Sequence, residues 1–129
     1  MQDAILISAA PGTVLPLSLD DAALHLQACF PGVRYWRKHA PVSRTDHLDF
    51  ETTLDGMTRH GSYFDRSHLV LRDGAPALWA GTIAWFLALL PSGTPTVAMV
   101  ESNPGTLRIP PGADAQEITD LLTGLLCAE

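Results

Sequence analysis

The sequence predicts an α+β domain, in which about three helices pack on an antiparallel or mixed β-sheet. Two observations support this most directly. Residues 46–64 alternate between apolar and polar side chains on either side of Asp55-Gly56, which is the pattern of a β-hairpin. Residues 75–90 form an apolar segment of helical length. The other strand-like segments follow one another through short connections, which favours a sheet built from sequence neighbours.

Length and composition indicate a folded domain with an acidic balance. The chain has 129 residues, 47% of them hydrophobic and 17% charged, so we expect a single domain over residues 1–129. Fourteen acidic against eight basic side chains give a formal charge of −6, and all the basic ones lie between Arg34 and Arg108. Because this charge repels phosphate, the sequence argues against duplex nucleic acid and favours attraction of a basic protein.

The two cysteines and the amino-terminal residues indicate the cellular compartment. Cys29 and Cys127 stand 98 positions apart and form neither a zinc motif nor a redox pair. Residues 1–3 lack the basic start of a signal peptide. We therefore expect free thiols, a cytoplasmic location, no membrane association and no cofactor.

The amino-terminal third contains a predicted strand, a helix and a second strand. Residues 4–8 are a short apolar run typical of a buried strand. Ser18 is a natural N-cap, and apolar residues then recur at helical spacing as far as Phe30. Residues 33–39 form the next strand-like segment, after a Pro-Gly break.

A type I′ turn at Asp55-Gly56 would fix the register of the hairpin, so that position i lies opposite position 111 − i. One face is then apolar and lies toward the core: Leu48, Phe50, Leu54, Met57 and Tyr63. The other face is polar: His47, Asp49, Glu51, His60 and Ser62. Gly61 lies opposite Phe50, whose ring can extend across it. A slip of one residue would exchange the two faces, so the pattern specifies the register.

The segment 75–90 is interpreted as the central helix of the core. After a strand at 67–72, we expect Asp73 to cap this helix and Pro76 to occupy its first turn. As a helix it would be about 24 Å long, too short for the roughly 30 Å of membrane hydrocarbon. It carries a strip of small residues, and its other sides are bulky and apolar. A helix apolar on all sides requires cover from the rest of the chain or from a second subunit.

The carboxy-terminal residues predict a second hairpin and a last helix. Residues 96–100 form a buried strand, and a turn at 103–105 leads to another strand at 106–109. Asp114 and Glu117 have the spacing of a capping box, and an apolar stripe at helical spacing follows them.

The polar face of the first hairpin contains the candidate catalytic and metal-binding residues. His47, Asp49 and His60 are donors that suit a divalent metal such as iron, zinc or manganese. His60 paired with Glu51 would form a general base with its orienting carboxylate, and Asp49 lies beside them. The same pattern is also expected of any strand pair with one face in solvent, and this interpretation is the one the sequence favours.

A second candidate site mixes cations and aromatic rings: Arg34, Tyr35, Trp36, Arg37 and Lys38. Such a run can stack bases or bind a small anion or an acidic peptide segment. It is also typical of an edge strand whose charges prevent aggregation and whose cations pack on the rings. The acidic balance of the chain favours the structural interpretation.

The sequence lacks the glycine motifs of nucleotide-binding enzymes and the serine elbow of hydrolases. We therefore expect a non-catalytic binding or regulatory module that acts through protein–protein contact, for example an immunity-type protein that neutralises a toxin, or one that self-associates as a homodimer. The alternative is a small enzyme or metal-binding protein that uses the polar face of the 46–64 hairpin.

Overall fold

The computed structural model describes residues 4–42, 44–110 and 112–127, and it shows three helices and a seven-stranded antiparallel sheet. The strand order is β2-β3-β4-β5-β1-β6-β7. The elements in chain order are β1 (Ile5–Ala9), α1 (Leu19–Cys29), β2 (Arg34–Ala40), β3 (Thr45–Leu54), β4 (Met57–Phe64), β5 (His68–Leu71), α2 (Pro76–Ala88), β6 (Thr96–Val100), β7 (Asn103–Arg108) and α3 (Ala115–Cys127). The predicted α+β class is confirmed, and every strand pair is antiparallel.

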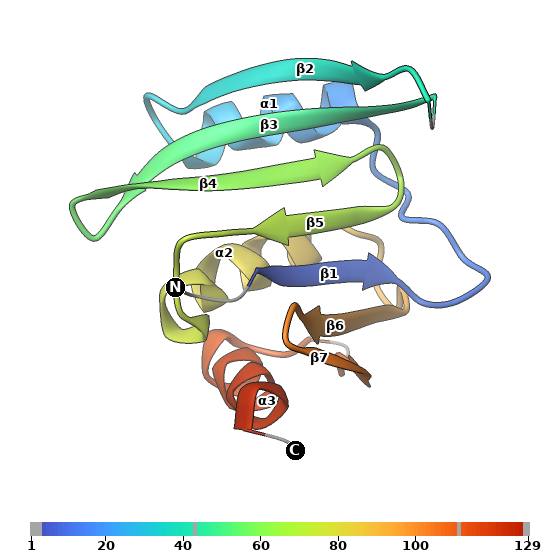
Figure 1. Ribbon diagram of the computed structural model, residues 1–129, viewed down its shortest axis with the longest axis vertical. Coiled ribbons are helices and arrows are strands. Elements are labelled where there is room, and N and C mark those ends of the chain that lie inside the picture. The colour runs from blue at the N-terminus through green and yellow to red at the C-terminus, as the bar shows by residue number, and fades with distance from the viewer. Residues whose placement is uncertain (1–3, 43, 111, 128–129) are drawn as a thin grey trace.

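The helices form one layer against one face of the sheet (Figure 1). Helix α1 packs against β3 and β4, while α2 and α3 lie side by side and α3 contacts β6 and β7. Alternate strand residues such as Ile5, Ile7 and Leu71 point into this layer and are buried. No helix of the described ranges lies on the opposite face of the sheet, and this arrangement leaves its side chains available for contact.

The register predicted for the first hairpin is confirmed. Leu48 pairs with Tyr63 and Phe50 pairs with Gly61, and all three side chains are buried. Asp55 and Gly56 have φ angles of 53° and 74°, as a type I′ turn requires.

The predicted core face of the hairpin is incomplete at the tip of the turn. Leu54 is half-buried and Met57 is 59% exposed. The tip of the hairpin projects beyond α1 in Figure 1.

The structure confirms two of the three predicted helix caps. Ser18 Oγ accepts a hydrogen bond from the N–H of Asp21 at 3.2 Å. Asp114 Oδ1 accepts from the N–H of Glu117 at 2.9 Å, and the Glu117 side chain accepts in return. The predicted cap at Asp73 is wrong, because Ala75 is the N-cap of α2 and makes no side-chain bond.

The chain itself covers the bulky side chains of α2 wholly or in part. Trp79, Ile83 and Phe86 are buried, whereas the exposed positions are small ones such as Ala77 and Gly81. A second subunit is thus not needed to cover the bulky residues, and self-association stays a prediction. None of the helices in the described ranges has the length and apolar character that crossing a membrane requires.

The predicted turn at 103–105 is misplaced by two residues. The chain turns at 101–102, and Asn103 already belongs to β7. The side-chain amide of Asn103 donates to the carbonyl of Leu125 in α3 at 2.9 Å, and its oxygen accepts from the N–H of Gly105. Asn103 thus joins β7 to α3. Local turn preferences do not predict such a long-range contact.

Candidate functional site

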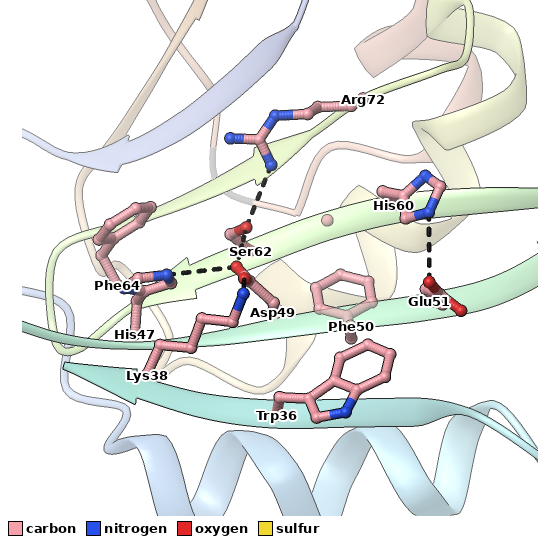
Figure 2. A pocket seen from close by; sticks show the side chains of 11 residues that line it. Trp36, Lys38, His47, Asp49, Phe50, Glu51, His60, Ser62, Phe64 and Arg72 are labelled. Atoms are coloured by element: carbon pink, nitrogen blue, oxygen red, sulfur yellow. Dashed lines mark hydrogen bonds and ion pairs between the residues drawn. The ribbon is translucent and has the colours of Figure 1, made fainter. Parts of the chain in front are cut away.

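The open face of the sheet is hollowed where β2, β3, β4 and β5 meet. The hollow has a volume of about 600 Å³. Strand alternation brings polar and aromatic side chains to it from β2, β3 and β4, and Arg72 reaches it from the residue after β5 (Figure 2). Its lining is Trp36, Lys38, His47, Asp49, Phe50, Glu51, His60, Gly61, Ser62, Phe64 and Arg72.

Asp49 is the centre of a hydrogen-bond network in the hollow (Figure 2). Ser62 Oγ donates to Asp49 Oδ1 at 2.6 Å, Lys38 Nζ lies 3.1 Å from Oδ2, and His47 Nε2 lies 3.4 Å from Oδ1. Partial burial raises the pKa of Asp49, but the bonds from Ser62 and Lys38 and the nearby positive charges outweigh burial, so its pKa lies below the ordinary value. Asp49 is therefore a fixed anion whose charge is already largely compensated.

A stack of three rings forms one end of the hollow. Phe64 lies between His47 and His68, with ring centroids 4.8 Å and 4.4 Å away. Burial lowers the pKa of His68. His47 Nδ1 is buried and has no hydrogen-bond partner among the described residues. Packing thus fixes the His47 ring, with its other nitrogen toward Asp49.

His60 lies at the other end of the hollow, between two carboxylates. Its Nδ1 is 2.7 Å from Asp73 Oδ2, and its Nε2 is 3.4 Å from Glu51 Oε1. The closer partner, Asp73, was not among the predicted site residues. The β4–β5 register indicates its position, because Gly61 lies opposite Leu71 and Asp73 follows two residues later.

The structure does not assemble the predicted metal set. His47 and Asp49 form one cluster, and His60 belongs to another with Glu51 and Asp73. Within the described parts of the chain, no three His, Cys, Asp or Glu side chains are placed to hold a metal ion. The hollow therefore contains two separate polar clusters, one around Asp49 and one around His60.

The predicted cation and aromatic run divides between the two faces of the sheet. Arg34, Trp36 and Lys38 lie on the open face, whereas Tyr35 and Arg37 lie opposite core residues of β3. The Arg34 guanidinium lies over the Trp36 ring, 5.3 Å from its centroid.

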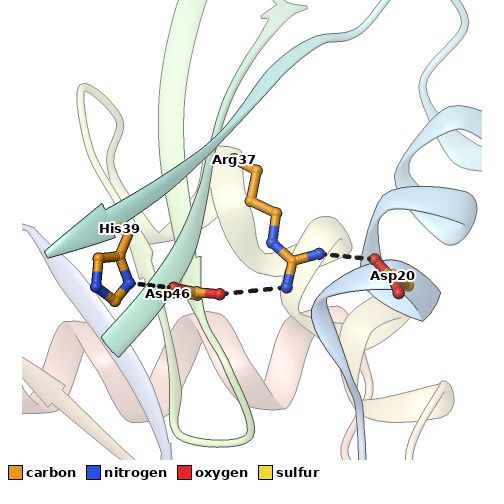
Figure 3. A network of polar contacts seen from close by, with 4 residues as sticks. All are labelled: Asp20, Arg37, His39 and Asp46. Atoms are coloured by element: carbon orange, nitrogen blue, oxygen red, sulfur yellow. Dashed lines mark hydrogen bonds and ion pairs between the residues drawn. The ribbon is translucent and has the colours of Figure 1, made fainter. Parts of the chain in front are cut away.

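Carboxylates from other elements neutralise these cations. Arg34 lies 3.8 Å from Glu51, and Lys38 pairs with Asp49. Arg37 bridges Asp20 of α1 and Asp46 of β3, and His39 joins Asp46 at 2.5 Å (Figure 3).

This network changes the pKa of the Asp46 carboxyl group. The hydrogen bonds from His39 and Arg37 lower its pKa. This network connects helix α1 to the β2–β3 hairpin, which supports the structural interpretation of Arg37.

Nothing among models of known families, curated proteins or solved structures matches this chain.

Proposed function

We propose that this protein is a non-catalytic binding module that contacts another protein through the open face of β2–β5. The observation that carries the proposal is a hollowed sheet face without a helix, with Trp36 41% exposed at its rim. Trp, Tyr and Arg are the residues that most often dominate the energy of protein interfaces. Arg34 holds the Trp36 ring in place by a cation–π contact, which reduces the entropy lost on binding.

The charges in the hollow support a protein partner over single-stranded nucleic acid. Asp49 and Glu51 line the hollow, so a phosphate backbone bound there would lie against two carboxylates. A protein surface can supply both signs of charge. The free thiols of Cys29 and Cys127 accord with a cytoplasmic setting, and neutralisation of a toxin remains the specific role that we propose.

Replacing Trp36 by alanine is expected to weaken partner binding about 30-fold or more, because truncating an interface tryptophan commonly costs at least about 2 kcal/mol. Affinity purification from the native cell with the wild-type protein identifies the partner. Titration calorimetry with that purified partner then measures its Kd for both proteins.

Leu24→Ala is the matched control for this experiment. Leu24 is 65% exposed on α1, in the helix layer, so its truncation removes an apolar contact from the other side of the molecule. We expect its Kd to stay within about twofold of wild type. Loss of binding in L24A with retention in W36A would assign the interface to the helices and overturn the proposal.

A second candidate function is favoured by one observation, the His60 contact with Asp73. A histidine whose Nδ1 is held by a carboxylate at 2.7 Å has the arrangement of a general base, with Nε2 facing the hollow near Glu51. Asp73 has a φ angle of 65°, a conformation that costs backbone strain and recurs at functional sites. The reaction class would be base-assisted hydrolysis of a ligand in the hollow.

Hydrolysis of p-nitrophenyl acetate and of bis(p-nitrophenyl) phosphate tests this second function. General-base catalysis predicts a loss of about 100-fold or more in H60Q. The variant H25Q removes an exposed histidine of α1 and controls for surface imidazole. Equal rates in wild type, H60Q and H25Q on both esters would contradict an enzymatic role for His60.

A further inference from the structure

Arg72 differs from the other cations of the hollow in its partners. Its Nη1 donates to Ser62 Oγ at 3.1 Å, and none of the carboxylates that the structure describes lies within ion-pair distance. Lys38 and Arg34, by contrast, are each paired with a carboxylate of β3. A guanidinium has five N–H donors in a planar fork, so most of the donors of Arg72 remain open to a ligand.

Charge is unevenly distributed between the two sides of the molecule. The strand registers place Arg34, Lys38 and Arg108 on the open face, and Arg72 continues it beyond β5. The carboxylates of Asp49 and Glu51 lie on the same face, and that of Asp73 reaches it at His60, so this surface carries charges of both signs. The three helices contain four acidic residues and no Lys or Arg, a formal charge of −4.

Asp49, the carboxylate joined to Arg72 through Ser62, already has other partners. Ser62 uses its hydroxyl hydrogen to bond Asp49, which leaves its oxygen to accept from Arg72. Lys38 and His47 also surround Asp49. The positive charge of Arg72 is therefore oriented by the network without being neutralised directly, and the aromatic ring of Phe64 lies in the same hollow.

We propose that Arg72 binds a side-chain carboxylate of the protein partner, and that an apolar side chain next to that carboxylate packs in the hollow against Trp36 and the edge of the Phe64 ring. This inference rests on the proposed function and specifies its contact chemistry: a segment with an Asp or Glu beside an apolar residue. An Arg–carboxylate pair forms two parallel hydrogen bonds, which fix the orientation of the bound segment. The helix layer, with its acidic charge, would face away from the partner.

A titration with two matched peptides tests the site without the natural partner. The probes are acetyl-Phe-Glu-amide and acetyl-Phe-Gln-amide, which differ in charge and hardly in shape. We expect the Glu peptide to shift the NMR signals of the Trp36 indole N–H and of the Ser62 and Arg72 amides, with an affinity about threefold or more above that of the Gln peptide at low salt. In R72Q the two peptides should bind equally.

Arg108→Gln is the matched control, because Arg108 lies on the same face at the far edge strand β7. This variant should retain the preference for the Glu peptide, and R72K should retain part of it. Equal binding of both peptides to the wild type, or a preference that persists in R72Q, would overturn the carboxylate site. Tighter binding of an oligouridine to the same signals would overturn it in favour of single-stranded nucleic acid.

The two proposals fail separately. If W36A loses the partner while the peptides show no dependence on Arg72, the open face is the interface and the carboxylate assignment is wrong. If the Glu peptide binds at Arg72 while W36A retains the partner, the site exists and the protein partner uses another surface.

Discussion

Replacing Gly61 by alanine is expected to lower the free energy of unfolding by about 3 kcal/mol, at the upper end of the cost of overpacking a core. A Cβ at Gly61 would lie 2.3 Å from Cζ of Phe50, far inside van der Waals contact. Phe50 is only 2% exposed, so a shift of its ring would disturb the packing of the core side chains around it. Urea denaturation of wild type and G61A measures the difference.

Two further variants identify the cause of this loss. Gly81→Ala adds the same methyl group in α2, where nothing lies within 4 Å of the new Cβ, and should stabilise by about 0.5–1 kcal/mol through helix propensity. Phe50→Leu removes the ring atoms in conflict, so the cost of G61A should fall in the F50L background. Additive losses in the double variant would show that ring contact is not the reason for the glycine.

The parts of the fold that follow from local sequence were predicted well. The Asp55-Gly56 turn requires positive φ at both residues, and this requirement alone fixes the pairing along β3 and β4. The caps at Ser18 and Asp114 follow from side chains within three residues of the bonds that they make. Such features depend on neighbours in the chain, which a single sequence displays.

The order of the strands in the sheet could not be predicted from the sequence. Strand β1 lies between β5 and β6, so its partners come from positions 68–71 and 96–100. No local pattern distinguishes this order from another antiparallel arrangement. For the same reason Asp73 was interpreted as a helix cap, because its partner His60 lies across a strand pair whose register depends on the 65–67 connection.

The candidate site was predicted in part. The polar hairpin face lines the hollow, together with Trp36 and Lys38 of the cation and aromatic run. Arg72 was missed as a site residue because its place depends on β5 lying next to β4. Phe64 was also missed, although the predicted hairpin register places it opposite His47. The acidic residues of α1 and α3 lie in one layer because the helices pack on one face of the sheet, an arrangement that no local sequence pattern displays.

Replacing Trp79 by alanine is expected to destabilise the protein by about 3–5 kcal/mol, the usual cost of removing a large buried aromatic side chain. Trp79 has no exposed surface, and its indole N–H donates to the carbonyl of Arg72 at 3.1 Å. The ring also fills the space at Gly74, where a Cβ would lie 2.7 Å from Nε1. Trp79 therefore supports the segment 72–74, which carries Arg72 and Asp73.

Trp79→Phe separates the role of the hydrogen bond from the role of volume. This variant retains most of the packing and leaves the carbonyl of Arg72 without its indole donor, which should cost about 1–3 kcal/mol and weaken the charge preference of the peptide site. Trp36→Phe, at a 41% exposed position, should change stability by no more than about 0.5 kcal/mol. If W79F keeps both full stability and the wild-type peptide preference, the indole N–H does not position Arg72, and the link between the core and the hollow is absent.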